Sequence, residues 1–186
     1  MIVGLHGFAQ SGKDTIGEEL VEKYGFERLS FADIIRDAVY ILNPIVFHNP
    51  MGETGRVRDL VDEYGWEWCK VNYPEIRRLL QVMGTEVGRD LIYEAIWIDG
   101  LRNKIRNGDY VITDVRFDNE AEMIRSNREG FLVKIVRDGV GPVNSHKSDS
   151  GLPDHLFDLI IDNDGSLEEF LESVEKIISM KPSTMV

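Results

Sequence analysis

A glycine-bounded loop near the start of the chain has the spacing of a phosphate-binding loop. Four residues ending in Ser11 separate Gly7 from Gly12, and Lys13 follows directly. Glycines at these positions let backbone N–H groups surround phosphate oxygens, and the lysine adds a positive charge for the β- and γ-phosphates. An apolar run precedes the loop and a helical pattern follows it, and the N-terminus of such a helix carries about half a positive charge. The loop therefore predicts a nucleoside triphosphate site.

The residue after Lys13 departs from the common pattern of such loops. Asp14 stands where Ser or Thr usually binds Mg²⁺, and the hydroxyl comes one residue later, at Thr15. Thr15 is then expected to contact phosphate, with Mg²⁺ held partly through water. Asp14 either binds this hydrated ion or orients the acceptor; the alternative is an acidic residue that merely suits the first turn of a helix.

A second polar pair follows an apolar run that begins at Tyr110. Asp114 ends this run, and Arg116 comes two residues later. Ligands of open parallel sheets bind at the carboxyl ends of the strands, so both side chains are expected beside the phosphate loop. They would place a carboxylate for metal or acceptor together with a guanidinium for phosphate. The alternative is a strand end with solvated charges.

The elements that must position these residues alternate between strands and helices. Apolar runs predict strands at residues 1–6, 27–31, 110–115, 131–136 and 157–161. Helical spacing predicts helices after the phosphate loop and at residues 32–42, 58–71, 74–83, 93–106 and 119–129, with a last helix capped by Ser166 and Glu169. Residues 44–57 and 138–153 are rich in turn formers and are predicted as loops, and residues 181–186 as a frayed tail. The alternation predicts an α/β fold with a parallel sheet covered on both faces.

Composition and charge narrow the classes of protein. The 186 residues suit one domain of ordinary composition, 42% hydrophobic and 29% charged. A net charge of −12 argues against binding to nucleic acid polymers or anionic membranes. Cys69 is the one cysteine, which excludes an intramolecular disulfide and fits a reducing cytosol. No run is long and apolar enough to span a membrane, and the start of the chain lacks the pattern of a secretion signal.

The triphosphate site belongs to a small phosphotransferase rather than to a GTPase or a motor. The Asn-Lys-x-Asp motif that reads guanine in GTPases is missing, since the one Asn-Lys pair, at residues 103–104, continues as Ile-Arg. A motor ATPase needs a longer chain. What remains is a kinase with an acceptor-binding insertion at about residues 33–107 and a lid at about residues 138–153.

Further blocks follow the loop in a recognisable order. They are Gly12-Lys13-Asp14-Thr15, the run from Arg77 to Glu86 (RRLLQVMGTE), Asp114-Val115-Arg116 with Glu120, the run from His146 to Pro153, and the run from Asn163 to Glu169. In this order the chain resembles bacteriophage-type deoxynucleoside monophosphate kinases. The resemblance covers most of the chain, is weakest at residues 45–68, and leaves the role of residues 44–70 open. It implies a five-stranded parallel sheet with flanking helices and the transfer of the ATP γ-phosphoryl group to a deoxynucleoside monophosphate.

Roles on the donor side follow from the loop and from the resemblance. ATP is expected to contact Gly7, Ser11, Gly12, Lys13, Asp14 and Thr15, with Mg²⁺ at Thr15 and Asp14. Asn163 and Gly165 resemble the turn beside the adenine, and the same residues also make a turn before a capped helix. Arg137 opens the predicted lid and is expected to clamp the transferring phosphoryl group. The predicted catalytic residues are Lys13, Asp14, Asp114, Arg116 and Arg137.

The acceptor phosphate needs converging arginines, because two anionic substrates must meet and guanidinium binds phosphate bidentately. The candidates are Arg36, Arg77, Arg78 and Arg116. Arg77 and Arg78 lie about 100° apart on a helix, so both need not face the site. If only one does, we favour Arg78, and the other is then a surface charge. The remaining predicted acceptor residues are Gln81, Gly84, Thr85, Trp97, Asp114 and Glu120. Gln81 reads a base edge or is merely exposed, and Trp97 lines the base pocket or lies in the core. Gly84 and Thr85 allow a close approach of the acceptor base or sugar, and Asp114 and Glu120 orient acceptor or metal.

Two rival interpretations stay open at this stage. One is another small P-loop kinase, acting on dephospho-coenzyme A or a ribonucleotide. The other is an inactive nucleotide-binding regulator, which would bind ATP without transferring phosphate. A cytoplasmic location, in the host if the chain is phage-encoded, follows from the kinase interpretation. A homodimer is expected at the family level only.

Overall fold

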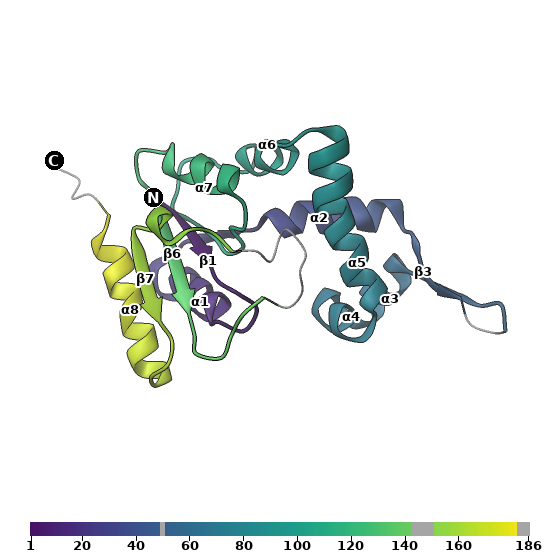
Figure 1. Ribbon diagram of the computed structural model, residues 1–186, viewed down its shortest axis with the longest axis horizontal. Helices are drawn as coiled ribbons and strands as arrows, with labels where there is room; N and C mark the ends of the chain where they lie inside the picture. Colours follow the sequence, from purple (N-terminus) through teal and green to yellow (C-terminus); the bar gives the residue numbers. More distant parts are fainter. Residues whose placement is uncertain (49–50, 143–150, 182–186) are drawn as a thin grey trace. The chain divides into compact units, whose positions relative to one another are not determined.

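The computed structural model describes residues 1–48, 51–142 and 151–181 (Figure 1). The chain divides into two compact units. Unit 1 comprises Met1–Phe31 and Leu101–Val186, and unit 2 comprises Ala32–Gly100. In the described ranges, no helix has the length and apolar character needed to cross a bilayer.

Unit 1 is built on a five-stranded sheet. Its strands are β1 (Ile2–His6), β2 (Glu27–Leu29), β5 (Tyr110–Ile112), β6 (Gly130–Val136) and β7 (Leu159–Asp162). They lie in the order β2-β5-β1-β6-β7, and every neighbouring pair is parallel. The predicted α/β fold with a five-stranded parallel sheet is thereby confirmed, and Figure 1 shows β1, β6 and β7 side by side.

Helices cover the sheet on both faces, as the alternation along β1 demonstrates. Val3 and Leu5 belong to a core cluster with residues of α1 (Lys13–Tyr24) and α8 (Leu167–Ser179). Gly4 points the other way, and a Cβ there would lie 2.5 Å from Ile124 of α7 (Asp118–Arg125). Because successive side chains of a strand face opposite sides, α1 and α8 cover one face and α7 covers the other. A short 3-10 helix, η3 (Asp154–Leu156), precedes β7.

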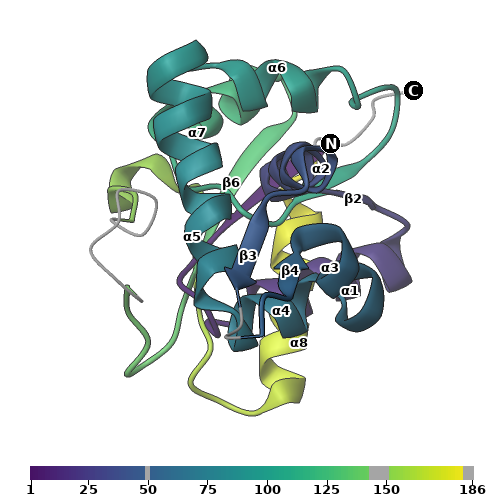
Figure 2. The ribbon, with the colours of Figure 1, turned by 90° about the vertical axis from the view of Figure 1, so that its right-hand side faces the viewer.

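Unit 2 is largely helical and contains a hairpin that the sequence pattern did not predict. Its elements are α2 (Phe31–Leu42), β3 (Ile45–His48), β4 (Thr54–Arg56), α3 (Val57–Tyr64), α4 (Trp66–Asn72), α5 (Pro74–Val82), the π-helix η1 (Met83–Ile92) and α6 (Ile96–Arg102). The chain enters the unit within α2 and leaves it within α6. Figure 2 shows β4 beside α3 and β3 beside α5.

The predicted loop at residues 44–57 is wrong over the antiparallel β3–β4 hairpin. Phe47 stacks on Tyr73 with ring centroids 5.7 Å apart, and a Cβ on Gly55 would lie 2.1 Å from the Phe47 ring. The stacking of Phe47 on Tyr73, together with the space that Gly55 leaves for the Phe47 ring, therefore stabilises the pairing of two largely exposed strands. The turn-forming residues of this segment had suggested a loop. The single helix predicted at residues 58–71 is two helices, because Gly65 adopts a φ of +77° between α3 and α4.

The helix predicted to end at Met83 instead continues as η1 to Ile92. Two glycines of η1 admit a close neighbour: a Cβ on Gly88 would lie 2.4 Å from the Trp97 ring, and the Gly84 carbonyl accepts a hydrogen bond from Trp97 Nε1 at 2.8 Å. A π-helix is rare and is frequently found at functional sites. The part of unit 2 that carries Gly84 and Thr85 is therefore an unusual local structure.

Candidate active site

Five strand ends bring the polar residues of unit 1 to one edge of the sheet. The phosphate loop follows β1, and Ser30, Asp114, Arg137 and Asn163 follow β2, β5, β6 and β7. All five strands run parallel, so their carboxyl ends meet at the same edge. The structure thus gathers the predicted donor residues although they are distributed over more than 150 positions of the chain.

The phosphate loop has the backbone that its glycines allow. Gly12 adopts a left-handed conformation with a φ of +104° directly before α1. Lys13 is only 8% exposed, and its Nζ donates a hydrogen bond to the Phe8 carbonyl of the loop at 3.3 Å. The hydroxyl of Ser11 is buried and has no hydrogen-bond partner in the described part of the chain. In the first turn of α1, Asp14 is exposed and Thr15 is half-buried.

The turn after β7 contacts the phosphate loop directly. Asn163 donates from Nδ2 to the Ser11 carbonyl at 2.8 Å. Two residues later, a Cβ on Gly165 would lie 2.6 Å from the Glu169 carboxylate, which closes a capping box with Ser166 at the start of α8. The predicted cap is therefore present, and it accounts for the missing side chain at Gly165.

Asp114 connects the end of β5 to the start of α2. Its Oδ2 accepts a hydrogen bond from the Ser30 hydroxyl at 2.8 Å, and its Oδ1 accepts one from the Phe31 N–H at 3.0 Å. A carboxylate at the N-terminus of a helix is favourable because it pairs with an N–H that has no partner within the helix. Asp114 therefore has a structural task in addition to the role in the site that its position predicts.

Glu120 lies beneath the segment that carries Arg116. Its side chain is only 2% exposed, and its Oε2 accepts hydrogen bonds from the N–H groups of Arg116 at 2.7 Å and Phe117 at 3.1 Å. The resemblance implies that Glu120 orients the acceptor or a metal, and this role stays a prediction. In the structure its buried carboxylate binds the backbone of the segment that carries Arg116.

Arg137 is exposed immediately after β6. The next residue, Asp138, donates its N–H to Asp164 Oδ1 at 2.7 Å and so joins the end of β6 to the turn after β7. The predicted lid extends from here to Pro153. Residues 143–150, which include His146, lie outside the described residues.

The predicted acceptor residues on α2 and α5 lie in unit 2 and form ion pairs there. Arg36 donates to Asp33 at 3.3 Å and to Glu67 at 2.7 Å, while its Nε is buried without a partner among the described residues. Arg78 is 58% exposed and donates from Nε and Nη2 to Glu75, both at 2.7 Å. The other residues expected on this helix, Arg77 and Gln81, are half-buried.

Trp97 belongs to the core of unit 2. It is 5% exposed, and its indole covers Gly88 and donates to the Gly84 carbonyl. Its predicted place in a base pocket is therefore corrected to the core alternative. Thr85 is likewise buried, at 5% exposure.

Three residues of interest carried no sequence motif. Ser30 is 3% exposed and bonds to Asp114. Arg89 is 7% exposed in η1 and donates to the Glu94 carbonyl at 3.2 Å. His6, at the end of β1, is 4% exposed, and its Nδ1 lies 2.8 Å from the Val115 carbonyl oxygen. Position at a strand end was the available signal for Ser30 and His6, and nothing in the spacing pointed to Arg89.

Burial lowers the pKa of His6, because a charged imidazolium is poorly solvated there. Lys134, Arg116 and Lys13 act in the same direction, and the hydrogen bond to Val115 opposes it. Between the lowered pKa and 6.5, the unfolded chain binds a proton that the folded chain does not, so stability rises with pH through this window.

Acidification from pH 7.5 to pH 5 is therefore expected to reduce the free energy of unfolding more in the wild type than in His6→Asn. Urea unfolding at the two pH values measures the difference. The lowered carboxyl pKa values of Asp154 and Glu169 act only at more acidic pH. An equal loss in both proteins would contradict the assignment to His6.

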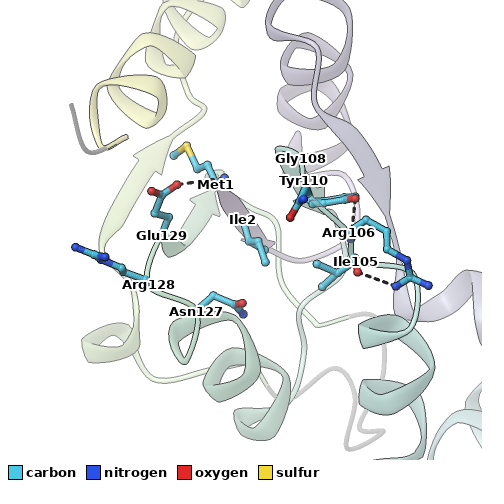
Figure 3. A pocket seen from close by; sticks show the side chains of 10 residues that line it. Met1, Ile2, Ile105, Arg106, Gly108, Tyr110, Asn127, Arg128 and Glu129 are labelled. Carbon is cyan, nitrogen blue, oxygen red and sulfur yellow. Dashed lines mark hydrogen bonds and ion pairs between the residues drawn. The ribbon is translucent and has the colours of Figure 1, made fainter. Parts of the chain in front are cut away.

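A pocket of about 230 Å³ lies at the opposite edge of the sheet (Figure 3). Met1, Ile2 and Tyr110, at the beginnings of β1 and β5, contribute to its wall. Arg106 and Arg128 also line it, but Figure 3 shows their guanidinium groups pointing away from each other. This pocket contains no residue of the phosphate loop and does not have the converging charges of a phosphate site.

Comparison with known proteins identifies the family of the chain. The sequence profile of the family described as deoxynucleotide monophosphate kinase matches residues 56–174, more than half of the chain. A relative from Acanthamoeba polyphaga mimivirus, provisionally named a deoxynucleotide monophosphate kinase, is 29% identical over 189 residues, 94% of each chain. The deoxynucleoside-5′-monophosphate kinase of Escherichia phage T5 is 27% identical over 82% of this chain and 85% of that protein. The deoxynucleotide monophosphate kinase of Escherichia phage RB69 is 37% identical over 55% of this chain and 44% of that protein.

Solved structures that align over most of the chain are more distant. The shikimate kinase from Aquifex aeolicus has a TM-score of 0.46 at 12% identity and covers 97% of this chain and 95% of its own. The dephospho-CoA kinase from Campylobacter jejuni has a TM-score of 0.40 at 18% identity and covers 96% and 94%. The family assignment rests on the sequence profile, which spans the segment carrying Arg77, Asp114 and Arg116 as one continuous match. The chain belongs to the deoxynucleotide monophosphate kinase family.

Proposed function

We propose that this chain transfers the γ-phosphoryl group of MgATP to a deoxynucleoside 5′-monophosphate, giving the diphosphate and ADP. The observation that carries the proposal is the phosphate loop with its buried Lys13, at the same sheet edge as Asp114 and Arg116, in a member of this family. Phosphoryl transfer needs little covalent chemistry from the protein. It needs in-line placement of the substrates and neutralisation of the charge that spreads over the transferring group.

The donor side requires groups for the phosphates and for Mg²⁺. Lys13 Nζ now contacts a carbonyl of its own loop, and this interaction is weak enough to be exchanged for phosphate oxygens. Mg²⁺ in nucleotide sites is usually held by one or two protein oxygens, with phosphate and water completing the octahedron. Thr15 and the exposed Asp14 fit this donor set, and the ion would neutralise phosphate charge when bound. Arg137 would reach the transferring group from the end of β6.

The predicted groups for the acceptor phosphate are Arg116 of unit 1 and, in unit 2, Arg36, Arg77 and Arg78. Among the predicted candidates Arg36, Arg77 and Arg78, Arg36 has a buried Nε that lacks a hydrogen-bond partner among the described residues, so it retains a donor for a phosphate oxygen. Arg78 would have to exchange both hydrogen bonds to Glu75 before it binds phosphate. We therefore favour Arg36 over Arg78 as the first contact of the acceptor phosphate, with Arg77 as a further candidate. Gln81, Gly84 and Thr85 stay predictions for the acceptor base and sugar.

A coupled ADP-release assay tests the function. MgATP would be combined with dGMP, dTMP, dCMP or dAMP, with the ribose counterparts, and with dephospho-coenzyme A. Turnover of deoxynucleotides supports the proposal and identifies the base. Turnover of dephospho-coenzyme A or ribonucleotides alone would favour another small kinase, and ATP binding without any turnover would favour a regulator.

Arg36→Gln is expected to raise the KM of the deoxynucleotide by about tenfold or more, because a charge-assisted hydrogen bond contributes about 1.5–3 kcal/mol. The KM of ATP should stay within about twofold. Arg56→Gln is the matched control, since Arg56 is an exposed arginine of the same unit that donates to the Asn43 carbonyl. Equal KM values in the two variants would remove Arg36 from the acceptor site.

Location and assembly complete the proposal. A kinase that draws on the pools of ATP and deoxynucleotides works in the cytoplasm, and in the host cytoplasm if the gene is viral, as in the relatives from phages and a mimivirus. A homodimer stays a prediction, which light scattering would test.

A further inference from the structure

The backbone around Arg116 is fixed at successive residues. The Val115 N–H donates to the Leu5 carbonyl at 3.1 Å, and the Val115 carbonyl lies 2.8 Å from His6 Nδ1. The next N–H, of Arg116, donates to the buried carboxylate of Glu120. Both ends of the peptide unit between Val115 and Arg116 are therefore bonded, and this unit sets the direction in which the Arg116 side chain leaves the backbone.

His6 supplies the side-chain donor in this arrangement. A carbonyl oxygen can only accept, so Nδ1 carries the proton, and the neutral ring has its acceptor at Nε2. The ring is 4% exposed and stacks on Phe157 with centroids 5.2 Å apart. Its edge approaches Phe8 of the phosphate loop, with centroids 6.4 Å apart. His6 also directly precedes Gly7, so one residue connects the phosphate loop to the segment that carries Arg116.

We infer that His6 is a positioning residue for phosphoryl transfer, which holds the Val115 carbonyl and thereby aims the Arg116 guanidinium at the phosphates. This inference rests on the proposed function. Arginine has a long side chain, so a small rotation of its peptide unit displaces the guanidinium by a much larger distance. A displacement of about 1 Å at a reacting group costs up to about a hundredfold in rate.

Two amide substitutions separate this hydrogen bond from the packing of the ring. The amide nitrogen in His6→Asn lies at the same number of bonds from the backbone as Nδ1, so it can donate to Val115. In His6→Gln the amide lies one carbon further out, near the place of Nε2, and the donor to Val115 is lost. Both variants bury an uncharged amide, and thermal unfolding shows whether each is folded. His155→Gln, at an exposed histidine of unit 1, is the control.

The expected result is a split between the two variants in deoxynucleotide turnover. His6→Gln should lower kcat by about ten- to a hundredfold while the KM of ATP changes by less than about threefold. His6→Asn should keep kcat within about threefold of the wild type, and His155→Gln should match the wild type. Equal kcat values for His6→Asn and His6→Gln would overturn the inference. If His6→Gln does not fold, His6→Ala replaces it, because this variant also lacks the donor.

A double-mutant cycle shows whether the effect runs through Arg116. In an Arg116→Ala background, His6→Gln should lower kcat by less than about threefold, since there is no guanidinium left to aim. Additive losses would overturn the inference even if His6→Gln alone is slow. A wild-type protein without turnover on any monophosphate would instead overturn the proposed function. Active wild type with unaffected His6→Gln overturns only the inference.

Discussion

Lys13→Ala is expected to lower deoxynucleotide turnover by at least about a hundred- to a thousandfold, the usual cost of removing one preorganised group that stabilises transition-state charge. Lys13 is buried at the start of α1, beside the positive end of the helix, where its charge is screened little by water. Its neighbouring backbone N–H groups remain in the variant, so ATP should still bind, with weaker affinity. Initial rates under saturating MgATP measure the loss in kcat, and calorimetry measures the affinity.

Lys23→Ala is the matched control for this prediction. Lys23 lies in the last turn of the same helix, is 58% exposed and pairs with Glu19 at 3.3 Å. Its removal tests the general effect of losing one positive charge from α1, and it should leave kcat within about twofold, since exposed ion pairs contribute little. Comparable rates for the wild type and Lys13→Ala would remove the phosphate loop from the reaction.

Local patterns predicted unit 1 well because each of its elements carries its own signal. The apolar run before Gly7 and the helical spacing after Lys13 occur as β1 and α1, and the capping pair Ser166 and Glu169 starts α8 as expected. Parallel pairing then fixes which residues share an edge, since strand ends alone place Asp114 and Asn163 beside the loop. The prediction succeeded because the spacing of the buried apolar residues can be read from a few neighbouring positions of the sequence.

Unit 2 was predicted less well because long-range contacts decide its local structure. The β3–β4 hairpin depends on Phe47 stacking on Tyr73, which lies 26 residues further along the chain. The π-helix η1 packs closely against Trp97, whose indole occupies the space over Gly88. The local propensities of the hairpin and of η1 do not reveal their distant partners Tyr73 and Trp97. Turn-forming residues therefore suggested a loop, and Gly84 suggested the end of a helix.

The candidate site also has features that the sequence predicted and features that it did not. Positions at strand ends were predictable, but the hydrogen bonds that orient them were not. The resemblance implied that Glu120 orients the acceptor or a metal, but it did not indicate that its carboxylate accepts hydrogen bonds from the N–H groups of Arg116 and Phe117. His6 had only its place before Gly7 to indicate a role. Side chains that position a backbone leave no spacing pattern, because their partners are main-chain atoms of any residue type.

Gly12→Ala is expected to weaken ATP binding by about a hundredfold and to destabilise the fold. The φ of +104° at Gly12 is unfavourable for any residue with a Cβ. The added Cβ would also lie 2.4 Å from Asn163 Nδ2 and 2.9 Å from the Phe170 ring. Asn163 would have to give up its hydrogen bond to the Ser11 carbonyl, and the loop N–H groups would move relative to the phosphates. Calorimetric titration with MgATP and urea unfolding measure the two effects.

Gly25→Ala separates backbone strain from the clash. Gly25 ends α1 with a φ of +71°, and nothing lies within 4 Å of the position of its Cβ. This variant should lose about 1–2 kcal/mol of stability from the left-handed conformation and keep the wild-type affinity for ATP. If both variants were destabilised equally and both bound ATP normally, the close packing of Asn163 and Phe170 against Gly12 would have no part in shaping the phosphate site. A selective loss of ATP affinity in Gly12→Ala would instead mean that the turn after β7 and the phosphate loop hold each other in the binding geometry.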